Sequence, residues 1–330
     1  MLQVRTADSS RKSRPLRVGD VVEIKSLAEI MESLDDAGRL DGMPFMPEMA
    51  AYCGRRAMVS ARAHKTCDGH GNLRWLDDTV HLDGLRCTGT DHGGCQARCR
   101  IFWKTAWLRR VTDLDADTGS HVMTVADGVQ LGWLRRSVHR SAPDRFVCQA
   151  TEVINASRPL PATNLKQYVW DVSSGNHSVR AVLSVLTKAL VNRYQRWSRT
   201  HLPLRLRIQG GRNLGHVEGA GTATPRRTLD LDIGERARVR PLPEIEPTLN
   251  SHNMNRGLMF DSEMARWCGA TGTVADRVQR IVDDRSGEMI EINSDCVILD
   301  GVTCRGGNRR LCSRNAYDYW REIWLERVED

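Results

Sequence analysis

The stretch Leu82-Asp83-Gly84-Leu85-Arg86-Cys87, followed by Cys95, occurs in two versions in this sequence of 330 residues. Near the C-terminus, Leu299-Asp300-Gly301-Val302-Thr303-Cys304 is followed in the same way by Cys312. In both versions the second cysteine comes 8 positions after the first. A tryptophan pair then follows in each: Trp103 with Trp107, and Trp320 with Trp324. Two thiols that recur at one spacing predict a duplicated module that binds a metal ion.

The repeat extends toward the N-terminal side of each version, at an offset of 215 positions that becomes 217 at Cys87. The aligned pairs include Gly19 with Gly234, Phe45 with Phe260, Glu48-Met49 with Glu263-Met264, Cys53-Gly54 with Cys268-Gly269, and Val59 with Val274. The second copy therefore has two extra residues between the equivalents of Asp68 and Leu82. Insertions of this kind belong in loop tips.

This alignment predicts four segments. They are a disordered lead-in at 1–15, a first metal-binding repeat at 16–111, a connecting region at 112–225, and a second metal-binding repeat at 226–330. The lead-in is polar and basic and lacks the apolar run of a secretory signal. No stretch has the roughly 20 apolar residues that span a bilayer, so we expect a soluble, cytoplasmic protein without a membrane span.

Each repeat is typical of a mainly β structure with helical insertions. In the first repeat we expect strands at 21–25, 56–66, 79–85 and 106–111, a helix capped by Ser26, and a short helix at 47–52. Because short strands leave exposed edges unless the sheet closes, an SH3-like barrel is the most economical arrangement. The predicted fold is a tandem of duplicated SH3-like barrels joined by a mixed α/β connecting region.

The connecting region contains the clearest helical pattern, at 178–197, where apolar residues recur on one face. We expect this helix to pack as a core helix on the two barrels, and the alternative is docking of a partner protein or a membrane surface. A hairpin is predicted at 121–131 with its turn at Asp127-Gly128, and a half-buried strand at 204–208.

The Gly-Asp turn, the helical insertion, Tyr52-Cys53-Gly54 and the closing aromatic-Leu-basic strand resemble the SH3-like barrel of the nitrile hydratase β-subunit group. That resemblance covers only the scaffold of each repeat. Because the metal site of that family lies on another subunit, it implies no catalytic residue for this sequence. The segments 92–96, 102–104 and 319–325 also resemble a family of bacterial proteins with two Cys-containing repeats, associated with biosynthetic gene clusters. The second resemblance implies an accessory or tailoring protein of small-molecule or peptide biosynthesis.

The cysteines predict two four-thiol metal sites, one in each repeat. The sets are Cys53, Cys87, Cys95 and Cys99 in the first repeat, and Cys268, Cys296, Cys304 and Cys312 in the second. Three cysteines of each set align, while Cys99 and Cys296 enter from different places in the chain. A tetrahedral Zn²⁺ site fits four thiolates, and an iron-sulfur cluster uses the same number. The alternative is a set of plain buried thiols.

The first repeat has additional donors, which are His64, Cys67, His81 and His92. Their aligned residues in the second repeat are Gln279, Val282, Ile298 and Arg309. We therefore expect the first repeat to carry any function, with His64 and His92 as candidate catalytic residues, and the second to be structural. A Cys95 nucleophile beside His92 is an alternative, although Cys312 has no neighbouring base.

The composition leaves two other classes of function open. A net charge of +7 and a pI near 9.0 permit a nucleic-acid-binding tandem module, but aromatic residues make up only 5% and the basic residues are dispersed. A non-catalytic scaffold, or a partner of a carrier protein, could use the helix at 178–197. A small molecule or a carrier-bound substrate fits the biosynthetic hypothesis.

Overall fold

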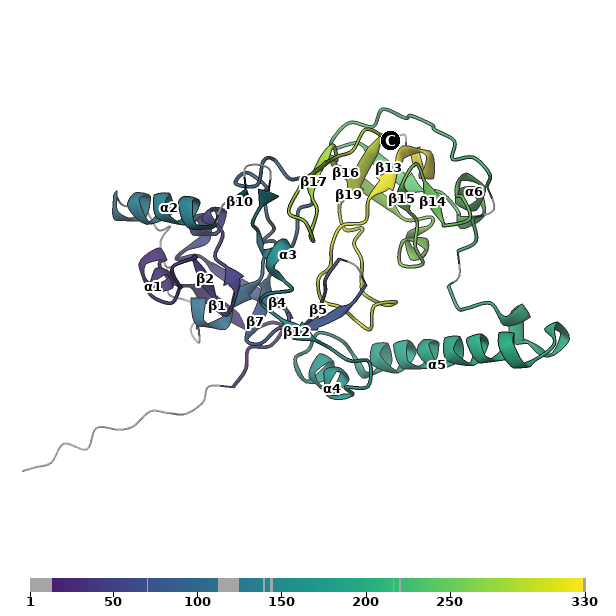
Figure 1. Cartoon of the computed structure of the whole chain (residues 1–330), viewed down its shortest axis with the longest axis horizontal. Helices are drawn as coiled ribbons and strands as arrows, with labels where there is room; N and C mark the ends of the chain where they lie inside the picture. The colour runs from purple at the N-terminus through teal and green to yellow at the C-terminus, as the bar shows by residue number, and fades with distance from the viewer. Residues whose placement is uncertain are drawn as a thin grey trace, which may run out of the picture.

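The computed structural model describes residues 14–69, 71–111, 125–138, 140–142, 145–215, 217–219 and 221–328. The fold is mainly β, with many short antiparallel strands and a few helices, as the sequence predicts. Each half of the molecule is organised around one five-stranded sheet (Figure 1). Residues 1–13 of the predicted lead-in lie outside the described part of the chain.

The two sheets have matching strand orders, β8-β7-β4-β1-β9 in the first half and β20-β19-β16-β13-β21 in the second. The first sheet contains β1 (Val21–Ile24), β4 (Arg56–Arg62), β7 (Thr79–Leu82), β8 (Trp103–Lys104) and β9 (Leu108–Arg110). The second sheet contains β13 (Arg236–Val239), β16 (Thr271–Arg277), β19 (Cys296–Leu299), β20 (Trp320–Arg321) and β21 (Leu325–Arg327). Strands in matching places therefore come from aligned parts of the sequence.

The match extends to the register of the strands. Val59 pairs with Leu82 and Val274 pairs with Leu299, and a register shift follows the valine in both ladders. A 3-10 turn, η2 (Thr105–Trp107) or η7 (Glu322–Trp324), joins the last two strands of each sheet. Within the described residues no ladder joins β8 to β9 or β20 to β21, so strand pairing leaves both sheets open. Closure into an SH3-like barrel stays a prediction.

Short helices follow the first strand of each sheet. In the first half, α1 (Leu27–Met31) begins after Ser26, whose side chain and that of Glu29 form a reciprocal capping box. The short helix predicted at 47–52 is the 3-10 helix η1 (Pro47–Tyr52). The second half has α6 (Leu242–Ile245), η5 (Glu246–Thr248) and η6 (Met264–Trp267) in the corresponding places.

Each half has a core built on one phenylalanine and two tryptophans, all fully buried. The ring of Phe45 meets Trp107 edge-on at 5.3 Å between centroids, and Phe260 meets Trp324 in the same way at 5.2 Å. Such edge-to-face pairs contribute beyond the burial of their apolar area. The recurring tryptophans are therefore core residues, as their repeated position predicts.

Small two- and three-stranded sheets surround the central ones. They pair β2 (Arg39–Leu40) with β3 (Met43–Pro44), β5 (Lys65–Cys67) with β6 (Leu73–Trp75), β14 (Met254–Asn255) with β15 (Leu258–Met259), and β17 (Arg280–Val282) with β18 (Met289–Glu291). The hairpin β5–β6 lies against the loop 304–316 of the second half, and the hairpin β17–β18 lies against the loop 87–99 of the first. The two halves thus contact each other through reciprocal hairpin–loop pairs.

The connecting region differs from the prediction in two places. The hairpin expected at 121–131 is wrong, because the described residues from 125 onward form the helix α2 (Val125–Val138), and residues 121–124 lie outside the described part. The strand expected at 204–208 is also wrong, since η3 (Leu204–Leu206) and η4 (Ile208–Gly211) occupy that stretch. The remaining elements are β10 (Arg140–Ala142), β11 (Arg145–Phe146), α3 (Gln149–Glu152), β12 (Arg158–Pro159) and α4 (Lys166–Ser173).

The helix predicted at 178–197 is confirmed as α5 (Val179–His201), whose N-terminus is capped by Ser178. Figure 1 shows it leading away from α4. Its predicted role as a core helix is wrong, because Leu183 is 57% exposed and Leu190 is 68% exposed. The buried side of α5 is largely polar instead, and Gln195 donates to the carbonyl of Ile208 at 3.0 Å. Across the described residues, none of the helices has the length and apolar character needed to span a bilayer.

Candidate metal centre

The loop 87–99 is held in a tight turn by glycine. Gly89 has a φ of +74°, and a Cβ at this position would lie 1.9 Å from the carbonyl oxygen of Cys95. The N–H of His92 donates to the carbonyl of Gly89 at 2.9 Å, and the N–H of Cys87 donates to that of Cys99 at 2.8 Å. Only glycine fits this position without a clash. The turn therefore brings Cys87 and His92 to the same side of the loop.

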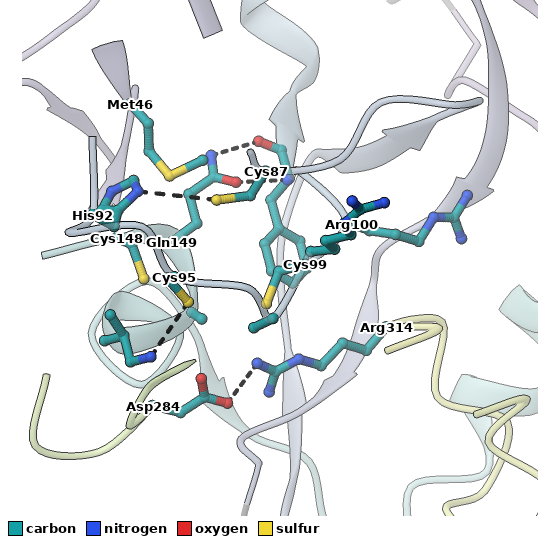
Figure 2. Close-up of a pocket in the computed structure, with 15 residues that line it drawn as sticks. Met46, Cys87, His92, Cys95, Cys99, Arg100, Cys148, Gln149, Asp284 and Arg314 are labelled. Atoms are coloured by element: carbon teal, nitrogen blue, oxygen red, sulfur yellow. Dashed lines mark hydrogen bonds and ion pairs between the residues drawn. The ribbon is translucent and has the colours of Figure 1, made fainter. Parts of the chain in front are cut away.

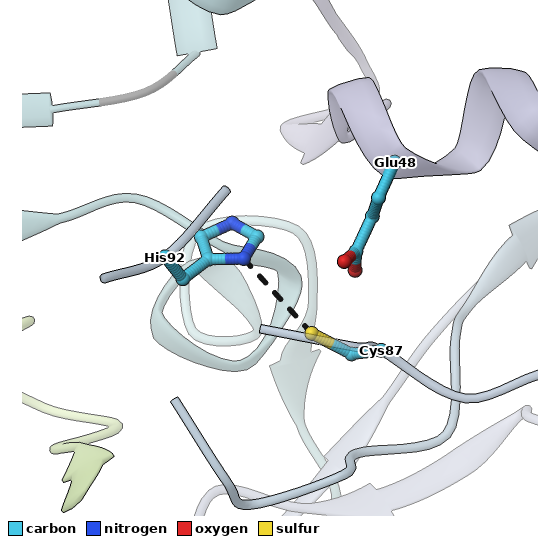
Figure 3. A group of neighbouring side chains, drawn as sticks. All are labelled: Glu48, Cys87 and His92. Carbon is cyan, nitrogen blue, oxygen red and sulfur yellow. Dashed lines mark hydrogen bonds between the residues drawn. The ribbon is translucent and has the colours of Figure 1, made fainter. Parts of the chain in front are cut away.

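Glu48, Cys87 and His92 form a cluster whose ligand atoms all lie within 4.8 Å of one another (Figure 3). The Sγ of Cys87 lies 3.9 Å from the Nδ1 of His92, which is only 1% exposed. Glu48 reaches the loop from η1 (Figure 3). A thiolate, an imidazole and a carboxylate are the three ligand types of protein zinc sites. These three residues could hold a metal ion.

The carboxylate of Glu48 is positioned by the loop itself. Its Oε2 accepts hydrogen bonds from the N–H of Thr88 at 3.2 Å and from the Thr88 hydroxyl at 2.7 Å. Its Oε1 is buried and has no hydrogen-bond partner among the described residues. A buried carboxylate oxygen without a donor is costly unless a cation or water satisfies it. One oxygen therefore fixes the side chain while the other is available to a ligand.

The surroundings of the Cys87 thiol disfavour its thiolate unless a cation is bound. Burial raises the pKa of Cys87 well above its ordinary value, and the negative charge of Glu48 raises the same pKa further. Without a cation the thiol is therefore protonated. A bound divalent cation would stabilise the thiolate and offset both effects.

Beside the cluster lies a small cavity lined by four thiols (Figure 2). Cys87, Cys95 and Cys99 come from the loop, and Cys148 comes from the connecting region. Burial raises the pKa of Cys99 to about 11 and that of Cys148 to about 12, so both are neutral thiols. The enclosed volume of about 20 Å³ is enough for roughly one water molecule or ion.

The structure distributes the predicted cysteine ligands over different surroundings. Cys53 packs in the apolar core of the first half, where burial raises its pKa to about 12. Cys268 packs at the edge of the core of the second half. Cys296 is buried in a separate apolar cluster with Val278 and Ile298. The described contacts therefore gather Cys87, Cys95 and Cys99 around one cavity, with Cys148 in place of Cys53.

Two of the candidate histidines have structural partners elsewhere. His64 is 1% exposed, and its Nε2 lies 3.1 Å from Oδ1 of Asp171 on α4. His81 is fully buried and its Nδ1 lies 2.8 Å from the carbonyl oxygen of Ile101, while burial lowers its pKa well below the ordinary value. Of the predicted donors, His92 is the one that joins the cluster with Cys87.

Glu48 and Cys148 are the two residues of this region that the sequence did not predict. Glu48 belongs to an aligned Glu-Met pair, but a carboxylate beside apolar residues on a short helix gave no sign of a ligand. Cys148 lies outside both repeats, so a search based on repeated cysteines could not include it.

The equivalent place in the second half has a different character. Its residues are Glu263, Cys304 and Arg309, aligned with Glu48, Cys87 and His92. Glu263 accepts a hydrogen bond from the main-chain N–H of Asn308. Burial raises the pKa of Cys304 to about 12, and the charge of Glu263 acts in the same direction. The guanidinium of Arg309 lies 3.9 Å from Asp261. A guanidinium in place of an imidazole offers no lone pair to a metal ion.

Comparison with protein-family models, with curated proteins and with solved structures finds no match for this chain.

Proposed function

We propose that the chain is a cysteine-ligated metalloprotein in which Glu48, Cys87 and His92 hold a Zn²⁺ ion. The observation that carries this proposal is the convergence of the three ligand atoms within 4.8 Å. Three protein ligands leave one position of a tetrahedral ion for water or substrate, as in catalytic zinc sites. Zinc bound in this way supplies a water molecule with a lowered pKa or polarises a carbonyl group.

Iron-sulfur binding is the second choice for the same region. Four cysteines line the neighbouring cavity, which is the number of thiolates that a cluster requires. The cavity encloses only about 20 Å³, room for roughly one ion rather than for several iron and sulfide atoms. The Cys, His and Glu donors also favour zinc over a cluster held by thiolates alone.

We further propose that the chain arose by duplication of one SH3-like module and that the first copy is the functional one. The matching strand orders, the matching register shifts and the 3-10 turn before the last strand of each sheet support the duplication. The replacement of the imidazole of His92 by the guanidinium of Arg309 supports a structural role for the second copy. A role in small-molecule or peptide biosynthesis rests on the family resemblance alone.

The proposal is tested by metal analysis and absorption spectroscopy of protein purified without oxygen. We expect about one zinc per chain and no visible absorption band. Replacement Cys87→Ser removes a ligand and should lower the zinc content, whereas the aligned Cys304→Ser should retain it. Unchanged metal content in Cys87→Ser contradicts the assignment, and a visible band with bound iron favours the cluster.

A further inference from the structure

The two hairpin–loop contacts between the halves are reciprocal, but they differ in one thiol. The N–H of Cys67 in β5 donates to the Sγ of Cys312 at 3.1 Å. The N–H of Val282 in β17 donates to the Sγ of Cys95 at 3.3 Å. Val282 is the residue aligned with Cys67, and Cys95 is aligned with Cys312. One interface therefore pairs two cysteines where its counterpart pairs a cysteine with a valine.

The two thiols of the first contact interact directly. The side chains of Cys67 and Cys312 share a hydrogen bond, and they are 8% and 4% exposed. The surrounding main chain fixes the pair, because the N–H and the hydroxyl of Ser313 donate to the carbonyl of Lys65 at 3.2 Å and 2.9 Å. Two thiols that are held in contact need little movement to form a bond.

A cationic group lies beside this pair. The guanidinium of Arg314 donates to the carbonyl of Cys67 at 3.1 Å and to Oδ2 of Asp284 at 2.5 Å. The hydrogen bond from Cys312, together with the positive charge of Arg314, lowers the pKa of Cys67 to about 5. The pKa of Cys312 is raised by the same hydrogen bond and by burial. Of the two thiols, Cys67 is therefore the more acidic and lies beside a guanidinium, and both features favour its reaction as a thiolate.

A small reagent has a route to Cys67. This residue lines a cavity of about 370 Å³ to which both halves contribute side chains, among them Cys304, Asp284 and Arg314. Cys312 does not line this cavity and packs with Cys67 in a buried apolar cluster. Cys67 is therefore the thiol that a reagent in the cavity reaches first. Cys312 is the thiol that can then attack a disulfide formed on Cys67.

We propose that Cys67 and Cys312 form an oxidisable dithiol site that reacts with small disulfides of the glutathione type and closes as a disulfide between the two halves. The thiolate sulfur of Cys67 attacks one sulfur of the small disulfide, so a mixed disulfide forms and one small thiolate leaves. The thiol of Cys312 then loses its proton and attacks the sulfur of Cys67, which releases the second small thiolate. The small disulfide is reduced to two thiols, and the protein dithiol is oxidised.

The experiment uses the full-length, metal-loaded protein and oxidised glutathione as the reagent. After incubation the free thiols are alkylated in denaturant, and the linked peptides are identified by mass spectrometry without reduction. We expect the loss of two free thiols and one cross-linked peptide pair that contains Cys67 and Cys312. Replacement Cys312→Ser should stop the reaction at the mixed disulfide of Cys67, and Cys67→Ser should leave Cys312 unmodified.

The second contact supplies a matched control that does not depend on a cysteine being removed. In the wild type Cys95 should form no cross-link to β17, because Val282 stands in the place that Cys67 has in the other contact. Replacement Val282→Cys recreates the pair at the aligned place and should add a second cross-link, to Cys95. The proposal is overturned if the wild type keeps all its thiols, whether or not Val282→Cys gains a bridge, or if the wild-type bridge joins Cys67 to Cys304 instead. It is also overturned if Cys67 accumulates as a stable mixed disulfide in the wild type.

Discussion

The Nζ of Lys65 lies 2.5 Å from Oδ2 of Asp171, and both side chains are at most 1% exposed. The other carboxylate oxygen of Asp171 lies 3.1 Å from the Nε2 of His64. This buried group joins β5 of the first half to α4 of the connecting region. Asp171 gives His64 a structural partner. Of the two histidines that the sequence predicts as catalytic candidates, His92 is therefore favoured over His64.

Replacement Asp171→Ala should destabilise the protein strongly, because it leaves the Lys65 ammonium buried without its partner. Removal of one partner of a buried ion pair typically costs about 3–5 kcal/mol of unfolding free energy. The double replacement Lys65→Met with Asp171→Leu should cost less, since no charge is left buried. Urea unfolding of the three proteins measures the difference. A loss below about 1 kcal/mol in Asp171→Ala would show that the group is hydrated in solution.

The organisation of the sheets could be predicted because local pattern and repetition pointed to the same strands. The stretch at 21–25, the Ser26 cap and the Gly-rich turns determine their structure from their immediate neighbours. The segment around Asp127-Gly128 was mistaken for a turn, because a glycine tolerated within the helix α2 gives the same local signal. The burial of α5 could not be predicted, because an apolar face shows amphipathicity but not which side meets the rest of the protein.

Only part of the candidate site could be predicted, because a repeat alignment shows residues within a repeat but not those that the fold brings in from distant segments. Cys87 is predicted because it recurs as Cys304, and His92 because the second repeat has Arg309 in its place. Glu48 and Cys148 come from distant segments, and only the fold brings them to the loop 87–99. Likewise, the pairing of Cys67 with Cys312 crosses between the halves, so an alignment of one repeat with the other could not reveal it.

His92 and Arg309 provide a matched pair of replacements for the metal site. His92→Ala removes a nitrogen ligand, and we expect zinc to be lost to a chelator at least about 10-fold faster than from the wild type. Arg309→Ala changes the aligned residue and should leave the rate of zinc loss unchanged. The rate is followed with a colorimetric chelator. Equal rates in the two variants and the wild type would place the ion elsewhere.

Phe45 and Phe260 test whether the two cores are energetically equivalent. Each ring is fully buried and lies edge-on to a tryptophan at nearly the same distance, 5.3 Å and 5.2 Å. Truncation of a buried phenylalanine to alanine typically costs about 3–5 kcal/mol. We expect Phe45→Ala and Phe260→Ala to fall in this range and to lie close together, as measured by chemical denaturation. A loss in only one variant would show that the two cores are not energetically equivalent.

The outward face of α5 should tolerate charge. Leu190 is 68% exposed, so Leu190→Glu should change the unfolding free energy by no more than about 0.5 kcal/mol. Val182 on the same helix is only 7% exposed, and Val182→Glu buries an unpaired carboxylate that should destabilise the protein. Thermal unfolding of both variants provides the comparison. A large loss of stability in Leu190→Glu would mean that this face is covered in solution.

Asp318 should make stability depend on pH. Burial raises the pKa of its carboxyl from 3.8 to about 8, and the charges of Asp261 and Glu263 act in the same direction. Its Oδ2 is buried without a hydrogen-bond partner among the described residues.

Between pH 3.8 and about 8 the folded state retains a proton that the unfolded chain has released. The contribution of Asp318 to stability is therefore complete below pH 3.8, falls as the pH rises through this window, and is lost above about pH 8. Asp318→Asn cannot ionise, so it should match the wild type near pH 4 and exceed its unfolding free energy by on the order of 5 kcal/mol near pH 8. Urea unfolding of both proteins across this range measures the difference, and parallel pH profiles would show that Asp318 is ionised in the folded state.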